Sequence, residues 1–299
     1  MLSQKPRLLI IGARGFVGQH LARRASAEFD VVRADLTAAD RAGVVIDLTS
    51  VTSIETAFRM ASPHVVILLA AISDIDACEA QPQLAEEINA RGVARVVEAC
   101  ARAGARLLFT SSAAVFDGTQ HGYRESDEPT PLSVYGRTKA SAEKLICQAL
   151  PAAIILRMAL VLGFAQDRGT NAMLNKFAEK LRAGQEIPLP NLEYRNPIDP
   201  GTLSDFILEL LRNPGASGII HVGASDPISR FDLGMRLAHR LGFSRDLIKV
   251  QNTPTPGRAA RGLDHFLLTE RIRTICQTPV PTCDEVVERA THGSSQGNL

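Results

Sequence analysis

Tyr135 and Lys139 are the residues of this sequence whose types and spacing best suit the movement of a proton. The stretch that joins them is expected to begin a helix, and residues four apart in a helix lie on one face. An ammonium group beside a phenol favours the phenolate. This spacing therefore predicts that the pKa of Tyr135 is lowered from its usual value of about 10. A tyrosine with a pKa nearer neutrality can act as a general acid or base.

A pair of serines, Ser111 and Ser112, supplies hydroxyl groups that could act with this tyrosine. They follow an apolar run that predicts a strand. In a parallel sheet, side chains at the carboxyl ends of the strands lie in the crevice where ligands bind. The chain has only three tyrosines, and Tyr135 is the one at the expected start of the helix that follows this strand. The combination of serine, tyrosine and lysine favours a proton-transfer site.

Three glycines follow the first expected strand and open the first expected helix. Glycines let the backbone turn sharply and approach a pyrophosphate, whose charge is stabilised at the N-terminus of the helix. The spacing is GxxGxxG rather than the commonest GxGxxG, and a tight turn without a ligand could also use it. Its place between a strand and a helix favours a dinucleotide. The predicted cofactor contacts in this turn are Gly12, Arg14, Gly15, Phe16, Val17 and Gly18.

The second expected strand ends at Asp35, whose carboxylate can accept hydrogen bonds from both hydroxyl groups of an adenosine ribose. The same carboxylate would repel a 2′-phosphate, so Asp35 favours NAD. Either Arg14 or Arg33 could instead pair with the 2′-phosphate of NADP. The prediction is therefore NAD(P), with a preference for NAD. Asp47 could reach the adenine amino group; alternatively, Asp47 or Thr49 could cap the next helix.

Short apolar runs alternate with helical patterns in the first half of the chain, as in a parallel sheet covered on both sides. Right-handed crossovers then give an α/β fold with a doubly wound, Rossmann-like sheet. The expected strands are residues 7–12, 30–35, 44–47, 64–70, 106–111 and 152–157. The expected helices are residues 15–25, 83–103 and 135–150. Later helices are expected near residues 171–183, 202–212 and 231–241, with a strand at 218–222.

This pattern divides the chain into three parts. Residues 1–165 are expected to form an NAD(P)-binding Rossmann domain. Residues 166–290 are expected to form a smaller, mixed α/β substrate-binding lobe, with room for some of its elements to return to the main sheet. Residues 291–299 are mostly small and polar, which predicts a flexible tail.

Composition excludes several classes of protein. Hydrophobic residues make up 45% of the chain, which is enough for a sizeable core. A net charge of +1 and an aromatic content of 5% argue against a nucleic-acid partner. No apolar run is long enough to cross a membrane. Five scattered cysteines without CxxC spacing predict reduced thiols, a cytoplasmic location and no metal site.

Several motifs together resemble those of the extended short-chain dehydrogenases/reductases. Their residues are most similar to the dTDP-4-dehydrorhamnose reductase-like branch of that family. The similar features in the first half are the glycine turn, Asp35, Ala70-Ala71, Asn89, the run Ser-Ser-Ala-Ala-Val-Phe-Asp-Gly at 111–118, and Pro-Leu-Ser-Val-Tyr-Gly-Arg-Thr-Lys at 131–139. The resemblance covers about residues 6–290 and is strongest in the first 165.

The resemblance implies roles for individual residues. Tyr135 would protonate a carbonyl oxygen as hydride arrives from the nicotinamide, and Lys139 would hold the nicotinamide ribose and tune the tyrosine. Ser112 would donate a hydrogen bond to the substrate oxygen. The catalytic residues would thus be Ser112, Tyr135 and Lys139. Further cofactor contacts would come from Asp47, Leu48, Ala70, Ala71, Asn89 and Met158.

The expected substrate is a small molecule, a nucleotide-linked sugar, reduced at a keto group. Its contacts are predicted at Ser73 and, in the second lobe, at Asn171, Arg195 and Arg258, with Arg261 as an alternative. Guanidinium groups suit a diphosphate. A homodimer is the expected assembly.

Two departures from the rhamnose branch leave other functions open. Ala113 and Ala114 stand where that branch has an acidic residue and a tyrosine, and no aromatic residue lies at 159–162. The run Ser-Ser-Ala-Ala-Val is closer to that of epimerases, so an NAD-dependent sugar-nucleotide epimerase is one alternative. A non-catalytic, cofactor-binding regulatory subunit is the other, because fold alone does not establish function.

Overall fold

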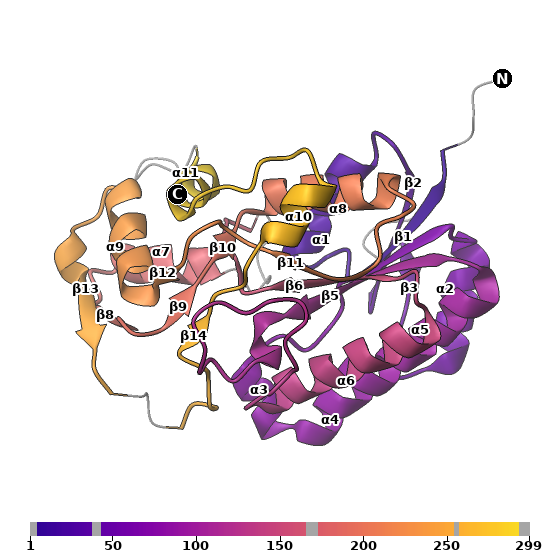
Figure 1. Ribbon diagram of the computed structural model, residues 1–299, viewed down its shortest axis with the longest axis horizontal. Helices are drawn as coiled ribbons and strands as arrows, with labels where there is room; N and C mark the ends of the chain where they lie inside the picture. The colour runs from indigo at the N-terminus through magenta and orange to yellow at the C-terminus, as the bar shows by residue number, and fades with distance from the viewer. Residues whose placement is uncertain (1–4, 38–42, 166–172, 254–256, 293–299) are drawn as a thin grey trace.

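A seven-stranded parallel sheet forms the centre of the protein (Figure 1). The computed structural model describes residues 5–37, 43–165, 173–253 and 257–292. The strand order is β11-β6-β5-β4-β1-β2-β3, so the sheet reverses its direction of winding between β1 and β4. The strands are β1 (Arg7–Ile11), β2 (Asp30–Asp35), β3 (Val44–Val45), β4 (Val65–Leu68), β5 (Arg106–Ser112), β6 (Ile154–Met158) and β11 (Gly218–Val222). The predicted Rossmann-like α/β fold is confirmed.

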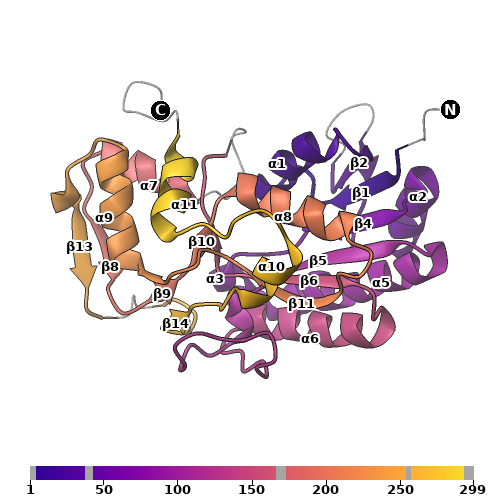
Figure 2. The ribbon, with the colours of Figure 1, turned by 45° about the horizontal axis from the view of Figure 1, so that its top comes forward.

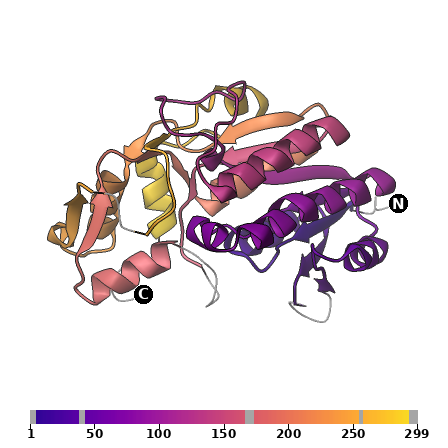
Figure 3. The same ribbon diagram turned by 90° about the horizontal axis from the view of Figure 1, so that it is seen from below.

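The central strands are largely apolar because both faces of the sheet are covered. In β1, Leu9 and Ile11 belong to the core on one face, while Leu8 and Ile10 belong to the core on the other. The first core is closed by α2 (Val51–Ala61), α5 (Gly92–Ala103) and α6 (Val134–Ala149). The second core is closed by α1 (Phe16–Ala25), α8 (Pro200–Arg212) and α10 (Glu270–Ile275). Figure 1 shows the sheet between these two helical layers, and Figure 3, seen from below, shows the layer that contains α5 and α6.

A smaller body lies beside the carboxyl ends of these strands (Figure 2). It has its own apolar core, formed mainly by α7 (Met173–Arg182), α9 (Arg230–Arg240), α11 (Cys283–Thr291), β8 (Ile187–Pro190) and β13 (Ile248–Gln251). Short pairings complete it: β7 (Leu160–Val161) with β10 (Pro197–Ile198), and β9 (Tyr194–Arg195) between β12 (Ile228–Ser229) and β14 (Asp264–His265). A short helix, η3 (Arg245–Leu247), precedes β13.

The second half of the chain contributes to both bodies. Strand β11 pairs with β6 at the edge of the main sheet, and α8 packs against α1 on one of its faces. Two ion pairs hold α8 in place: Arg24 of α1 pairs with Asp205, and Glu28, in the turn after α1, pairs with Arg212. The chain therefore crosses from the small body to the main sheet and back.

The helix expected over residues 83–103 is interrupted. It is built from α4 (Pro82–Glu86), a π-helical turn, η1 (Glu87–Arg91), and α5, and it follows the short helix α3 (Ile75–Ala80). The remaining short helix, η2 (Ala113–Val115), directly follows β5. Single π-turns inside helices are frequent at functional sites, and this one carries Asn89.

Two of the sequence predictions fall outside the described residues. Asn171 lies in the segment 166–172, and most of the expected tail lies in 293–299. All five cysteines are within the described ranges, and all are free thiols. In the part of the chain that the structure covers, no helix combines the length and apolar character needed to cross a membrane.

The glycine turn yields a test of the packing between β1 and α1. A Cβ atom at Gly18 would lie 2.3 Å from the carbonyl oxygen of Gly12, whereas at Gly15 the nearest atom would be 3.2 Å away. Gly18→Ala is expected to lower the free energy of unfolding by about 1–3 kcal/mol, as other overpacked sites do. Gly15→Ala should cost less. Urea denaturation measures both, and equal losses would show that this close approach does not limit the turn.

Candidate active site

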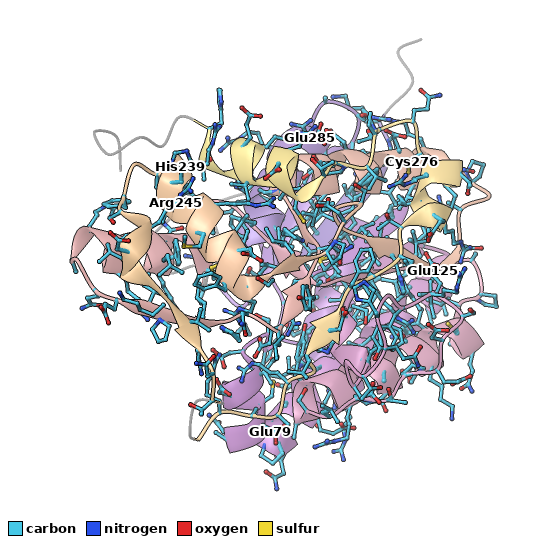
Figure 4. The ribbon with its side chains drawn as sticks, turned by 60° about the vertical axis from the view of Figure 1, so that its left-hand side comes forward. Glu79, Glu125, His239, Arg245, Cys276 and Glu285 are labelled. Atoms are coloured by element: carbon cyan, nitrogen blue, oxygen red, sulfur yellow. The ribbon has the colours of Figure 1, made fainter. Side chains whose placement is uncertain are left out.

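Helix α6 reaches the end of β5 through a contact that requires glycine. A Cβ atom at Gly136 would lie 2.1 Å from the carbonyl oxygen of Ala114. The Ser133 side chain caps the helix by accepting a hydrogen bond from the Gly136 amide at 3.1 Å. Glu79 of α3, labelled in Figure 4, accepts a hydrogen bond from the Val134 amide at 2.6 Å. These contacts fix the first turn of α6 against the carboxyl end of the sheet.

Tyr135 lies in this first turn and is 9% exposed. The Ser112 side chain lies close enough to the Tyr135 phenol to lower its pKa. Burial has the opposite and larger effect and raises the pKa of Tyr135 to about 12, because a phenolate would be poorly solvated there; the Cys78 thiol adds to this rise. The predicted lowering of the Tyr135 pKa is therefore wrong, since burial is the largest effect on it. The phenol keeps its proton at neutral pH, which suits a proton donor.

Lys139 is buried one helical turn after Tyr135. Its Nζ donates a hydrogen bond to the carbonyl oxygen of Thr110 at 2.9 Å. The same atom lies 4.5 Å from the ring centroid of Phe109 and 5.9 Å from that of Tyr135. Burial lowers the pKa of Lys139 to about 8, and the Glu143 carboxylate opposes this change. The ammonium group is thus held beside the tyrosine by the main chain of β5.

Asn89 is fully buried in the π-helical turn. Its Oδ1 accepts a hydrogen bond from the Ile72 amide, and its Nδ2 donates one to the Ile72 carbonyl, both at 2.9 Å. Both ends of this amide are therefore engaged by the segment after β4. The structure places Asn89, a predicted cofactor contact, as a support for the chain next to Ser73.

The glycine turn is shaped for close approach by a ligand. Gly12 has a φ of +90°, and a Cβ atom there would lie 2.7 Å from the Ala70 amide nitrogen. Arg14 and Gly15 are exposed, and helix α1 begins directly after them, at Phe16 and Val17. The N-terminus of α1 is therefore open to an anionic group.

Asp35 and Arg14 meet at the end of β2. The Asp35 carboxylate accepts hydrogen bonds from the Arg14 amide at 3.0 Å and from the Leu36 amide at 2.9 Å. The Arg14 guanidinium donates a hydrogen bond to the Thr37 hydroxyl. A carboxylate and a guanidinium, the two groups that discriminate between a ribose 2′-hydroxyl and a 2′-phosphate, thus lie at one point.

Asp47 folds back on its own chain. It accepts hydrogen bonds from the amide and the hydroxyl of Thr49, both at 2.8 Å. The residue that caps α2 is Ser50, whose side chain accepts a hydrogen bond from the Ser53 amide at 3.2 Å. The alternative in which Asp47 or Thr49 caps this helix is therefore wrong. Leu48 beside them is buried.

The other residues predicted near the nicotinamide also gather at the carboxyl end of the sheet. Ala70 and Ala71 directly follow β4, and the Ala70 amide donates a hydrogen bond to the Ile11 carbonyl at 3.1 Å. Met158 ends β6 and is the register partner of Ser112 on β5. The structure therefore brings the glycine turn, residues 70–71, the serine and Met158 to one edge of the sheet.

A cavity of about 330 Å³ lies between this edge and the small body. Four predicted residues line it, namely Ser112, Ser73, Arg195 and Arg258. Arg230 and Arg261 also line it, so four guanidinium groups border one space. Such a cluster suits a ligand that carries phosphate groups.

Most hydrogen-bond donors of the Arg195 guanidinium are engaged by main-chain carbonyl groups. It is 8% exposed, and its guanidinium donates hydrogen bonds to the carbonyl groups of Tyr194, Leu263 and Gly262 at 2.6–3.1 Å. Burial lowers the pKa of Arg195 to about 10. This predicted substrate contact joins β9 to the chain before β14, and only part of its hydrogen-bonding capacity can face the cavity.

Asp76 of α3 joins the two sides of the cavity. Its carboxylate accepts hydrogen bonds from the Arg261 guanidinium at 2.9 and 3.1 Å and from the Ala259 amide at 2.8 Å. Arg258 lies 3.5 Å from the same carboxylate. The hydrogen bond from Arg261 is the main reason that the pKa of Asp76 falls to about 2. Arg258 and Arg261 are therefore both held by Asp76, which lies on the main-sheet side of the cavity.

Sequence reasoning missed several residues of this site. Asp76 and Arg230 lie in two runs that are also similar to the rhamnose branch, Asp-Ala-Cys-Glu at 76–79 and Ser-Arg-Phe-Asp at 229–232, but neither was predicted to contact the substrate. Glu143 lies one turn after Lys139 and forms a buried ion pair with Arg157 at 2.6 Å. A signal for this pair did exist, because Arg157 interrupts an otherwise apolar strand and Glu143 continues the helical face of the tyrosine and lysine.

Within the described ranges, no group of three or more His, Cys, Asp or Glu side chains is placed to bind a metal ion. Comparison with known proteins identifies the family. Residues 6–294 match the RmlD substrate binding domain family. The chain belongs to this family.

Relatives within and around the family differ in their described activities. The chain is 31% identical over 277 residues to dTDP-4-dehydrorhamnose reductase from Mycobacterium tuberculosis, covering 91% of this chain and 87% of the relative. It is 26% identical over 237 residues to methionine adenosyltransferase 2 subunit beta from Xenopus laevis, covering 78% and 71%. The crystal structure of Bacillus anthracis dTDP-4-dehydrorhamnose reductase in complex with NADP superposes with a TM-score of 0.87 at 24% identity, covering 96% and 99%. This last likeness establishes the fold.

The tie between Asp76 and the loop at 258–261 predicts a difference in proteolysis. Asp76→Asn is expected to speed cleavage by trypsin after Arg258 and Arg261 at neutral pH, because the loop loses a charged partner. Mass spectrometry of timed digests measures the rates. Asp284→Asn, which removes a surface ion pair with Arg236, is the matched control and should leave these cuts unchanged. Equal rates in wild type and Asp76→Asn would contradict the tie.

The same tie predicts how the loop responds to acid. The pKa of Asp76 is about 2 in the folded protein, below its ordinary value of 3.8, so the attachment is complete above about pH 4. It is lost as the pH falls through about 2, where Asp76 takes up a proton. Hydrogen exchange of residues 257–262 between pH 5 and 3 should therefore show no loss of protection beyond the ordinary change in intrinsic rate.

Proposed function

We propose that this protein is an NAD(P)-dependent oxidoreductase that reduces a keto group of a nucleotide-linked sugar. The observation that carries the proposal is the buried Tyr135 phenol beside Ser112, whose side chain lines the cavity. Its membership in the RmlD substrate binding domain family, and its likeness over most of its length to a dTDP-4-dehydrorhamnose reductase, support the choice of reaction.

The residues at the end of β1 fit a dinucleotide. Gly12 and Gly18 allow the backbone to turn tightly, and the exposed amides before α1 can face a pyrophosphate. Asp35 would accept hydrogen bonds from the adenosine ribose. When bound, the reduced cofactor supplies hydride to the carbonyl carbon, and residues 70–71 and Met158 would border its nicotinamide end.

The protein's part in the reaction is to supply a proton and to balance charge. As the carbonyl oxygen becomes negative, Tyr135 gives up its proton to that oxygen. Ser112 donates a hydrogen bond to the same oxygen and stabilises the developing charge. The phenolate left on Tyr135 is stabilised by the Lys139 ammonium, which the Thr110 carbonyl holds in place. A raised pKa keeps Tyr135 protonated, which fits the direction of reduction.

The cavity supports a nucleotide-linked substrate. Arg230, Arg258 and Arg261 border it with cationic groups, and guanidinium forks match the oxygens of a diphosphate. The sugar would then extend from these arginines toward Ser112. A non-catalytic, cofactor-binding regulatory subunit, the other alternative, would not require serine, tyrosine and lysine to be packed in this geometry.

Removal of the phenol hydroxyl tests the proposed proton donor. Tyr135→Phe should lower kcat/KM by about 10²–10⁴-fold with 4-keto sugar nucleotides and NADH or NADPH, while cofactor affinity is retained. Tyr194→Phe is the matched control, because Tyr194 lies outside this hydroxyl pair. If wild type and Tyr135→Phe were equally inert while both bound cofactor tightly, the oxidoreductase proposal would fail.

The carboxylate of Asp35 leads us to propose a preference for NAD. We expect NADH to bind more tightly than NADPH, because the carboxylate would repel a 2′-phosphate. Fluorescence titration gives the two dissociation constants. A tenfold or greater preference for NADPH would instead assign the deciding role to Arg14 and Thr37, whose side chains meet beside Asp35.

A further inference from the structure

Three polar side chains form a row across the edge of the main sheet. Ser111 of β5, Arg157 of β6 and His221 of β11 are register partners, so they stand side by side on adjacent strands. Each is at most 3% exposed. The row lies one residue before the carboxyl ends, directly behind Ser112 and Met158. Polar groups this deep require partners on the helix that covers them.

Glu143 of α6 is that partner for Ser111 and Arg157. Its carboxylate accepts hydrogen bonds from the Arg157 guanidinium at 2.6, 3.0 and 3.1 Å and from the Ser111 hydroxyl. The guanidinium carbon lies 4.9 Å from the Phe116 ring centroid, and Nη1 lies 3.5 Å from Nε2 of His221. A buried ion pair is weak evidence for stability, because removing two charges from water offsets much of their attraction. Stability alone therefore does not explain why Glu143 and Arg157 are buried here.

Glu143 lies on the same helix as Tyr135 and Lys139, and this position suggests a role in the site. Tyr135, Lys139 and Glu143 are spaced four residues apart on α6 and share one face. The charged or titratable groups that act on Lys139 are Glu143 on its own helix and Cys78 on α3, together with the Tyr135 ring beside it. Burial works against the charge of Lys139, and Glu143 is the carboxylate that opposes this effect.

We propose that Glu143 is a positioning residue for the reaction: anchored by Arg157 and Ser111, its carboxylate holds the Lys139 side chain against the Thr110 carbonyl beside Tyr135. The proposal rests on the proposed function only for its kinetic consequence. Arg157 holds the carboxylate toward the sheet, and His221 and Phe116 close the far side of the guanidinium. Cys147, also on α6, is a further titratable group near Glu143: burial and this carboxylate both raise the pKa of its thiol.

The first test measures the charge of Lys139 directly in the full chain. The protein has six lysines, so NMR of lysine labelled with ¹³C at Cε resolves few signals, and Lys139→Met identifies the one that matters. In Glu143→Gln, the Lys139 signal should titrate about one pH unit or more below its wild-type midpoint, because an opposite charge has been removed. An unchanged midpoint would overturn the proposal.

A second variant separates this effect from folding. Glu143→Gln alone leaves Arg157 buried without its charged partner and is expected to destabilise the protein. The double variant E143Q/R157M removes both charges and should restore much of the lost Tm. The proposal expects the lowered Lys139 midpoint to persist in the double variant. Recovery of the wild-type midpoint together with Tm would show that the pair serves packing alone.

The kinetic test uses the same variants. Activity should fall as the pH rises through the pKa of Lys139, and this alkaline limb of kcat/KM should move to lower pH in E143Q and in E143Q/R157M. Glu98→Gln, which removes the carboxylate of an exposed ion pair with Arg102, is the matched control, so its limb should stay at the wild-type pH. A uniform loss of activity with an unmoved limb would overturn the proposal. If wild type reduces none of the sugars, the proposed function fails, and the NMR titration still decides the role of Glu143.

Discussion

The close packing of α6 against the end of β5 is the constraint on which the rest of the site depends. Gly136 lets the helix approach the Ala114 carbonyl to a distance that any side chain would prevent. That approach brings the Tyr135 hydroxyl to Ser112 and excludes water from both Tyr135 and Lys139. Desolvation then acts on each group in the direction of its neutral form. The phenol holds its proton more tightly, and the ammonium holds its own less tightly.

The raised pKa of Tyr135 and the lowered pKa of Lys139 limit the pH range in which the two residues can act together. Between neutral pH and about 8, Tyr135 is neutral and Lys139 is still cationic, which is the pairing that a proton donor with a charged neighbour requires. The lysine is the weaker member, because burial favours its neutral form. An anchored carboxylate one turn away counteracts this without reaching the cavity. The charge of Lys139 thus depends on a buried carboxylate between α6 and the sheet as well as on groups that border the cavity.

The sequence was informative wherever local pattern decides structure. Apolar runs predicted the strands that end near Gly12 and Ser112, because most side chains of a strand buried on both faces must be apolar. The strand at 218–222 was predicted too, but its place beside β6 depends on contacts that no local pattern contains. The direction of the Tyr135 pKa was missed for a related reason. Spacing shows that a lysine is near, whereas desolvation depends on what the fold packs around both groups.

The substrate side was the least predictable part of the site, because its residues come from segments far apart in the chain. The arginines that border the cavity already have acidic partners: Asp76 engages Arg258 and Arg261, and Glu193 lies 3.7 Å from Arg230. An anionic ligand that enters must therefore exchange partners with these carboxylates. A single negative charge gains little from such an exchange, whereas a diphosphate can engage several guanidinium groups at once. In the proposed function, Ala113 and Ala114 add no polar side chain beside Ser112, so selection among substrates would fall to this exchange and to the shape of the cavity.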